Sequence, residues 1–258
     1  MGETASRGRD RIGRLAVTAL PPPSQRRDRA IVLVHGAWVG EWSWSPILPL
    51  LEASGRPVVN VSLTGHGMRS HQSGPHITLD GHVADVVGAI ETLDLERVTL
   101  VGHSYGGRVI SAVAHRIPGR LERLVYLDAH APSGPDSGQT PERIAIAAEH
   151  GGMLPFSGYD PDPETFGGAE GVRWFLERVR PQSFATFMEP LPDGLPDGVA
   201  RTYVFATGYS PTRFAGYAAG ASADPTWEYV ELDGSHWLMF THPEQVARIA
   251  LGDPISSS

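Results

Sequence analysis

Ser104 has a glycine two positions before it and another two positions after it, within the run Leu100–Gly107. An apolar, β-branched run from Val98 precedes this serine, and apolar residues at helical spacing follow it. The order predicts a strand, a sharp turn and a helix, with Ser104 at the turn. A residue at such a turn has strained backbone angles, so the residues two positions before and two positions after it must be small. Gly102 and Gly106 meet that need. Short glycine–serine patterns also arise by chance in a chain with 30 glycines, so the serine needs partners elsewhere before it indicates chemistry.

A serine hydroxyl is a weak nucleophile and needs a neighbouring base. His236 lies in the run Gly234–Trp237, directly after the last predicted strand, where a loop can reach Ser104. The chain has 11 histidines, so position rather than residue type makes His236 the candidate general base. The helix that follows Ser104 adds free N–H groups and a dipole that favour developing negative charge. Together these features predict acyl transfer.

An acyl-transfer site also needs two N–H groups that point at one developing oxyanion. The N–H of Tyr105, directly after Ser104, is one candidate. The second is the N–H of Ala37, in the run His35–Trp38 that follows an apolar segment. That run is also compatible with a plain turn between a strand and a helix, in which Gly36 serves only its backbone angles.

The elements that must position these residues alternate along the chain. The predicted strands are Ala30–Val34, Arg56–Leu63, Arg97–Val101, Leu121–Leu127, Arg201–Ala206 and Trp227–Leu232. The predicted helices are Trp42–Ala53, Leu79–Leu93, Arg108–His115 and Pro243–Leu251. Strands and helices in alternation predict an α/β fold whose parallel sheet carries helices on both faces. Such sheets bind ligands at the carboxyl ends of their strands, where His35, Ser104 and Asp128 fall.

The alternation stops after residue 130. We predict that residues 30–130 and 199–258 form the core and that residues 131–198 form an inserted helical cap. Helical patches within the cap are predicted at Pro141–His150, Pro163–Val179 and Pro181–Met188. Its aromatic residues suit either the roof of an apolar pocket or a small core of the cap itself. Residues 1–29 are predicted to be a mobile extension, with one short strand at Ile12–Leu20 as the alternative.

The composition excludes several classes of function. The formal charge of −8 gives no basic surface for nucleic acid, and no apolar run is long enough to span a membrane. The chain has no cysteine and no lysine, which excludes thiol nucleophiles, Schiff bases and the P-loop lysine. We expect a cytoplasmic enzyme that needs no cofactor, and the question of a homodimer stays open.

Four histidines, His66, His71, His76 and His82, raise the question of a metal site. Their spacing fits no single helical face, and the segment around them is rich in glycine, proline and serine. A solvated loop near the site is therefore expected, and no metal.

Five runs together resemble the α/β-hydrolase superfamily. They are His35–Trp38, Trp42–Trp44, Gly102–Gly107, Tyr126–Ala129 and Gly234–Trp237. More narrowly, the chain is similar to the branch of plant methyl-salicylate-type esterases, hydroxynitrile lyases and their bacterial relatives. The resemblance covers about Ile31 to Leu251. It implies the α/β-hydrolase fold and a triad in the order nucleophile, acid, histidine.

The chain departs from that branch at the triad acid. The resemblance implies an acid after the penultimate strand, yet the loop Ala206–Pro211 contains no carboxylate. Asp128, which ends the strand after the nucleophile strand, is the substitute, since some members of the superfamily carry their acid there. Its alternative role is a cap or turn, because aspartate commonly bonds its own backbone. Asp224 and Asp233 are the remaining candidates.

A second departure concerns lyase chemistry. Hydroxynitrile lyases of this branch carry a lysine just after the catalytic histidine. Trp237 stands at that position here, so cyanohydrin cleavage is not expected.

The sequence therefore predicts a serine hydrolase that cleaves an ester or lactone of an apolar or aromatic small molecule. The residues expected to line the substrate pocket are His35, Trp38, Trp174, Phe184 and Trp237. Two alternatives remain open. In one, a His–Asp pair without a cofactor acts as the base for oxygenation, cyclisation or C–C cleavage. In the other, the same fold binds a ligand without turning it over.

Overall fold

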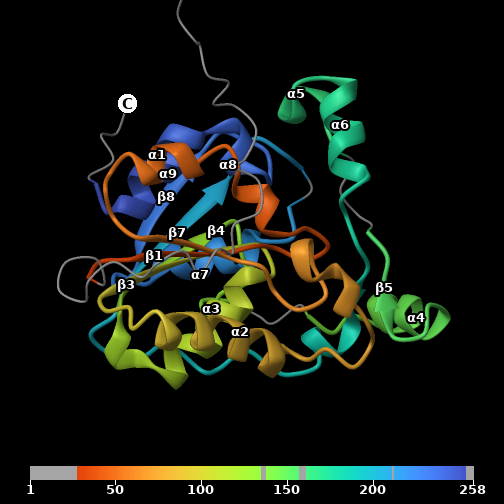
Figure 1. The fold of residues 1–258 in the computed structure, drawn as a ribbon, viewed down its shortest axis with the longest axis horizontal. Coiled ribbons are helices and arrows are strands. Elements are labelled where there is room, and N and C mark those ends of the chain that lie inside the picture. The colour runs from red at the N-terminus through yellow and green to blue at the C-terminus, as the bar shows by residue number, and fades with distance from the viewer. Residues whose placement is uncertain (1–27, 135–137, 157–160, 211, 254–258) are drawn as a thin grey trace, which may run out of the picture.

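The computed structural model describes residues 28–134, 138–156, 161–210 and 212–253 (Figure 1). The predicted N-terminal extension therefore lies outside the described residues, apart from its last two positions, and so does the strand considered at Ile12–Leu20. Asp28, the first described residue, forms an isolated parallel bridge with Glu96.

Six parallel strands form the central sheet, in the order β2-β1-β3-β4-β7-β8. Their bounds are β1 Ile31–Val34, β2 Val58–Val61, β3 Val98–His103, β4 Leu121–Leu127, β7 Ala200–Ala206 and β8 Glu228–Leu232. Every strand predicted for the core is present, with slightly different ends, and the α/β fold class is confirmed. The chain runs from β1 to β2 on one side and returns to β3 on the other side. The carboxyl ends of β1 and β3 therefore bound the crevice where such sheets bind ligands.

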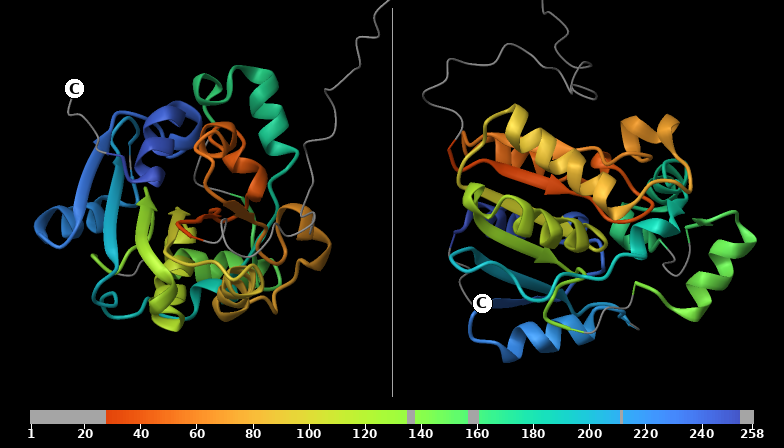
Figure 2. Two further views of the ribbon diagram at one scale, coloured as in Figure 1. Left: turned by 60° about the vertical axis from the view of Figure 1, so that its left-hand side comes forward. Right: turned by 90° about the horizontal axis from the view of Figure 1, so that it is seen from below.

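Both faces of the sheet are covered by helices. Alternate residues of β1 enter different apolar clusters, with Val32 and Val34 in one and Ile31 and Leu33 in the other. Helices on the first face are α2 Leu79–Thr92, α3 Gly106–Arg116 and α7 Ala215–Ala223, and those on the second are α1 Leu48–Glu52, α8 Leu238–Thr241 and α9 Pro243–Leu251. Figures 1 and 2 show α2 and α3 on one side of the sheet and α1 and α9 on the other. Burial on both faces explains why β1 is a continuous apolar run.

The helix predicted at Trp42–Ala53 is wrong as one continuous element. The segment forms a 3-10 helix, η1 Glu41–Trp44, and the separate short helix α1. Pro46 and Pro49 explain the break, because proline lacks the N–H that a helix interior needs. Pro49 instead lies in the first turn of α1, where that N–H has no intrahelical partner.

The inserted segment is less helical than predicted. Its elements are α4 Pro141–Glu149, β5 Met153–Leu154, α5 Pro163–Phe166, α6 Ala169–Leu176, β6 Gln182–Ser183 and the 3-10 helix η4 Phe184–Phe187. The helix predicted at Pro163–Val179 is interrupted by Gly167 and Gly168, whose φ angles are 73° and 102°. The helix predicted at Pro181–Met188 is wrong at its start, where β6 pairs antiparallel with β5, and the rest of it is the 3-10 helix η4. The elements of this segment lie beside the central sheet (Figure 1).

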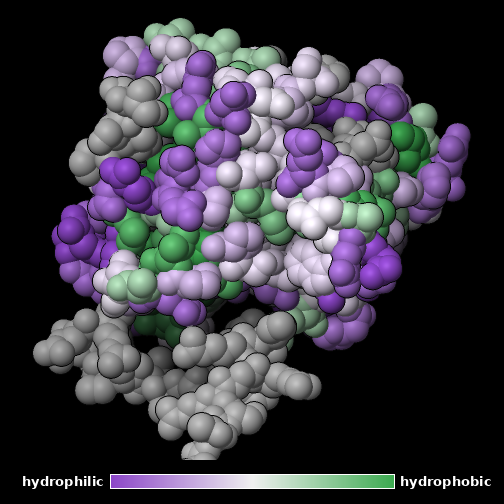
Figure 3. All heavy atoms as spheres, turned by 90° about the horizontal axis from the view of Figure 1, so that it is seen from above, coloured by the Kyte–Doolittle hydropathy of each residue, from purple (hydrophilic) through white to green (hydrophobic). Residues whose placement is uncertain are grey.

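The surface is mixed in character. One face shows small hydrophobic groups separated by hydrophilic residues (Figure 3). Among the described residues, no helix is both long enough and apolar enough to cross a membrane.

We predict that Gly106→Ala destabilises the protein. A Cβ at Gly106 would lie 2.5 Å from the Val34 carbonyl oxygen and 2.9 Å from that of His35, so backbone must move. The expected loss is about 1–3 kcal/mol in the free energy of unfolding, measured by urea denaturation. Gly88→Ala in α2 is the control, since a Cβ there meets nothing within 4 Å. The control should gain about 0.5–1 kcal/mol. Equal stability of the two variants would contradict the close approach.

Candidate active site

Ser104 stands between β3 and α3, at the sharp turn that the glycine pattern predicts. Its φ angle is 54°, in the left-handed region, and the residue is 7% exposed. A Cβ at Gly102 would lie 2.8 Å from the Gly106 carbonyl group, which explains the small residues on either side. The Ser104 N–H donates to the Leu127 carbonyl at 3.2 Å, and its carbonyl accepts from the His130 N–H at 3.1 Å. The turn is therefore fixed to the carboxyl end of β4.

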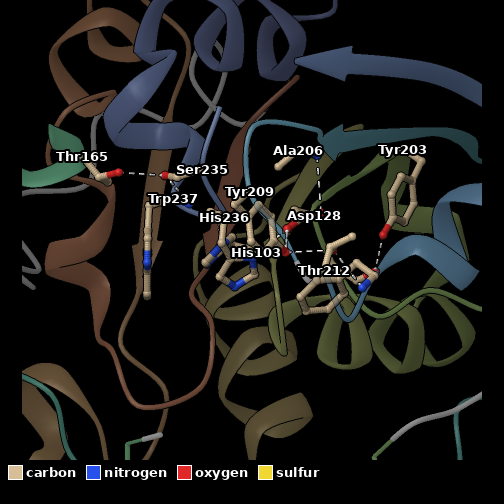
Figure 4. Close-up of polar contacts among 12 residues, drawn as sticks. His103, Asp128, Thr165, Tyr203, Ala206, Tyr209, Thr212, Ser235, His236 and Trp237 are labelled. Atoms are coloured by element: carbon tan, nitrogen blue, oxygen red, sulfur yellow. Dashed lines mark hydrogen bonds and ion pairs between the residues drawn. The ribbon is translucent and has the colours of Figure 1, made fainter. Parts of the chain in front are cut away.

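Asp128 follows β4 directly and meets His236 from the loop after β8 (Figure 4). His236 Nδ1 lies 2.7 Å from Asp128 Oδ2, although the two residues are 108 positions apart. Asp128 is fully buried and His236 is 3% exposed. Since an ionised carboxylate only accepts, His236 Nδ1–H donates, and the lone pair of a neutral imidazole then lies on Nε2.

Sequence reasoning missed two further donors to Asp128. The Tyr209 hydroxyl donates to Oδ2 at 2.6 Å, and the Ala206 N–H donates to Oδ1 at 3.4 Å. Both come from the end of β7 and the loop behind it, the place where the resemblance implies the acid itself. A tyrosine in a glycine-containing loop has no pattern that marks it. The only available signal was the absence of a carboxylate there.

Burial shifts the two titrating groups of this pair in opposite directions. Burial raises the pKa of Asp128, and the hydrogen bonds from Tyr209 and Ala206 oppose that rise. Burial lowers the pKa of His236, and the positive charge of Arg213 lowers it further. A neutral imidazole at neutral pH is the form that can accept a proton.

Aromatic rings and a backbone contact hold the His236 ring in place. The Phe214 ring is stacked on it, with ring centres 5.1 Å apart and an interplanar angle of 6°. His103, the last residue of β3, donates Nε2–H to the His236 carbonyl oxygen at 2.9 Å. Trp237 packs edge-on at 5.4 Å. The loop is therefore anchored to the strand that carries Ser104.

The loop after β1 lies directly against Ser104. A Cβ at Gly36 would be 3.1 Å from the Ser104 Cβ, a tight contact that glycine avoids. His35 Nε2 accepts from the Leu63 N–H at 3.1 Å, which leaves Nδ1–H to donate to the Gly36 carbonyl at 2.8 Å. Within the described part of the chain, the N–H groups of Ala37 and Tyr105 donate to no backbone carbonyl. Both are thus available to an oxyanion.

The prediction of a solvated histidine loop is wrong for His66 and His82, which are buried. His82 lies on α2, and its Nε2–H donates to the Thr64 carbonyl at 2.9 Å while Nδ1 accepts from the Tyr105 hydroxyl at 2.9 Å. His71 and His76 are exposed. Among the described residues, no group of three or more histidine, cysteine, aspartate or glutamate side chains could hold a metal ion.

The residues predicted to line a substrate pocket fall in different places. Trp38 lines a small pocket, together with Glu142, Arg143, Ile146, Leu154 and Arg213. His35 is fully buried at the start of the loop after β1, and the Trp237 ring packs edge-on against both His236 and Phe175. Trp174 lies edge-on to Trp42, and Phe184 begins η4 in the inserted segment.

The other two candidate acids lie elsewhere. Asp224 accepts from the N–H and hydroxyl of Thr226 at the turn before β8, and Asp233 is exposed. Asp128 is therefore the carboxylate that the structure brings to His236.

Residues 31–249 match the sequence profile of the alpha/beta hydrolase family. The chain belongs to this family. It is 36% identical over 236 residues to the carbendazim hydrolyzing esterase of Nocardioides sp. (strain SG-4G), a match that covers 84% of this chain and 96% of the relative. It is 35% identical over 107 residues to the alpha-hydroxynitrile lyase of Arabidopsis thaliana, covering 41% of this chain and 42% of the relative.

Solved structures agree with this assignment at the level of the fold. Polyneuridine aldehyde esterase has a TM-score of 0.64 at 23% identity, with 88% of this chain and 99% of that chain covered. A methylesterase from Arabidopsis has a TM-score of 0.66 at 21% identity, with 87% and 98% covered. The resemblance inferred from the sequence is confirmed. The relatives named as esterases and hydrolases make the chain an enzyme of this superfamily and support ester hydrolysis in general.

We predict opposite pH dependences of stability for two variants of the buried pair. In Asp128→Asn, the remaining His236 stays neutral when folded but takes up a proton in the unfolded chain below about pH 6.5. The free energy of unfolding should therefore fall as the pH drops below 6.5. In His236→Asn, the buried Asp128 keeps its proton when folded at pH values above its ordinary pKa of 3.8. The unfolded chain then binds fewer protons, and the free energy of unfolding should rise as the pH falls toward 4.

Urea denaturation between about pH 4.5 and 7.5 measures both slopes, each at most about 1.4 kcal/mol per pH unit. All other titrating groups are common to the two variants, so each variant controls for the other. Parallel slopes would show that burial does not shift the two groups as stated.

Proposed function

We propose that this protein is a serine hydrolase that cleaves an ester or lactone of an apolar small molecule through an acyl-enzyme. The observation that carries the proposal is the 2.7 Å contact between His236 Nδ1 and the buried Asp128. Asp128 lies at the end of the strand to which the Ser104 turn is hydrogen-bonded. Family membership and the esterase named among its relatives support the same class of reaction.

In the proposed reaction, the Ser104 hydroxyl attacks the substrate carbonyl carbon while His236 Nε2 takes its proton. Asp128 holds the imidazole by its Nδ1–H and stabilises the imidazolium that forms. His236 then gives the proton to the leaving alcohol as the C–O bond of the ester breaks. Water attacks the acyl-enzyme by the same route in reverse, which releases the acid and restores Ser104. The reaction needs only water as a co-reactant.

The negative charge of the tetrahedral intermediate would be stabilised by the N–H groups of Ala37 and Tyr105. Tyr105 lies at the N-terminus of α3, where the helix dipole adds to the same effect. The Gly36 contact with Ser104 and the His35 hydrogen bonds support this role, because they fix the loop next to the nucleophile.

The lining of the pocket next to Trp38 supports a partly apolar substrate. Trp38, Ile146 and Leu154 give the pocket apolar walls, and charged side chains share its lining. Carbendazim, the compound named for the bacterial relative, is the first substrate to assay.

We predict that a fluorophosphonate probe forms one adduct, on Ser104, in the native protein. Intact-protein mass spectrometry followed by peptide mapping measures this. Ser104→Ala should abolish the adduct and lower ester turnover by at least about a thousandfold. Ser111→Ala is the control, since Ser111 is a buried serine on α3 whose hydroxyl donates to the Gly107 carbonyl. It should label like the wild type.

The same variants separate the proposal from its two rivals. A base-driven reaction would survive largely intact in Ser104→Ala, because the His–Asp pair would do the chemistry. A ligand-binding protein would leave every ester unchanged and give back its ligand intact. Absence of the Ser104 adduct under native conditions would refute acyl transfer.

A further inference from the structure

A chain of hydrogen bonds runs from the segment after β7 to the Asp128–His236 pair. The Phe214 N–H lies 3.1 Å from Thr212 Oγ1, which lies 3.0 Å from the Tyr209 hydroxyl oxygen. The Tyr209 hydroxyl lies 2.6 Å from Asp128 Oδ2, the same oxygen that His236 contacts.

Donor and acceptor chemistry fixes the direction of every bond in this chain. The Phe214 N–H can only donate, so Thr212 Oγ1 accepts it. An ionised Asp128 can only accept, so the Tyr209 hydroxyl gives its proton to Oδ2. The Thr212 hydroxyl therefore gives its proton to Tyr209. All donors point toward the carboxylate, an arrangement in which each bond polarises the next.

We infer that Tyr209 is a positioning residue, whose hydroxyl keeps Asp128 ionised and its Oδ2 directed at His236. The Tyr209 hydroxyl donates to Asp128, and its ring lies tilted against the imidazole with the ring centres 5.8 Å apart. The inference rests on the proposed function, because the pair matters for catalysis only if His236 serves Ser104.

The other ionisable groups around the pair keep the same protonation state between about pH 5 and 8. His103 from β3 donates to the His236 carbonyl, and burial lowers its pKa. Burial likewise lowers the pKa of His130, whose Nδ1 lies 2.9 Å from the Tyr217 hydroxyl. Burial raises the pKa of Tyr203 on β7 and of Tyr229 on β8, and the positive charge of Arg213 lowers the pKa of His236. The pair itself is therefore the group that titrates in this range.

We predict that Tyr209→Phe shifts the acidic limb of the pH–rate profile of Ser104 labelling to higher pH. Losing a donor to the carboxylate makes the Asp128–His236 pair more basic, so it takes up its inactivating proton at a higher pH. The expected shift is about one pH unit. The measured quantity is the second-order rate of Ser104 labelling by a fluorophosphonate between about pH 4.5 and 8.

Two controls make the result specific. Tyr126→Phe removes another buried tyrosine hydroxyl, one that lies 2.9 Å from Ser111 Oγ. It should leave the limb where the wild type has it. In an Asp128→Asn background, adding Tyr209→Phe should change the labelling rate little, because the residue through which Tyr209 acts has lost its charge.

An unshifted limb in Tyr209→Phe would overturn the inference, and so would an equal shift in Tyr126→Phe. If the fluorophosphonate does not label wild-type Ser104 at all, the proposed function fails. The inference about Tyr209 is then tested by a titration that needs no catalytic activity. The NMR titration of the His236 Cε1–H signal, assigned by its loss in His236→Asn, reports protonation of the pair directly. Its midpoint should rise by about one pH unit in Tyr209→Phe, and an unchanged midpoint would refute the inference.

Discussion

A fully buried carboxylate needs hydrogen-bond donors around it, and the rest of the site depends on how Asp128 obtains them. The donors come from His236 in the loop after β8, Tyr209 in the loop after β7 and Ala206 at the end of β7. These loops converge because β4, β7 and β8 are neighbours in a parallel sheet and end at the same edge. The Asp128 N–H continues the β4–β7 pairing by donating to the Val204 carbonyl at 2.8 Å. The sheet register therefore sets where the acid lies.

Much of this arrangement could be predicted from the sequence, because β1, β3 and the end of β4 are buried, largely apolar runs, and Ala37, Ser104 and Asp128 follow them. Asp128 emerged from the resemblance, because the loop after β7 has no carboxylate and some members of the superfamily carry their acid after the strand that Asp128 follows. Tyr209 did not, because its partner is 81 positions away and no spacing marks a hydroxyl donor. His66 and His82 were misassigned for a similar reason. Polar side chains in a glycine-rich segment indicate solvent, and only the tertiary contacts with α2 and Tyr105 bury them.

Residues beside the site also attach the inserted segment to the core. The Trp38 indole donates Nε1–H to the Leu154 carbonyl at 2.8 Å, and its own carbonyl accepts from the Arg180 N–H at 2.8 Å. Trp38 directly follows Ala37 and has a φ angle of 64°, a strained value that such anchoring can maintain. In the loop after β8, the ring of Trp237 packs against Phe175 of α6, with the ring centres 4.9 Å apart. The inserted segment therefore contacts the loop after β1 and the loop after β8 at once.

The imidazoles around Ser104 must stay neutral for this geometry to hold. His35 accepts from the Leu63 N–H, and a proton on that Nε2 would remove the bond that holds the loop bearing Ala37. His82 likewise uses Nδ1 to accept the Tyr105 hydroxyl. Burial lowers the pKa of both His35 and His82 to about 4, so neither becomes charged near neutral pH. Burial thus has two effects on the site. It raises the pKa of Asp128, and it keeps His35 and His82 neutral, which is the state that their hydrogen bonds require.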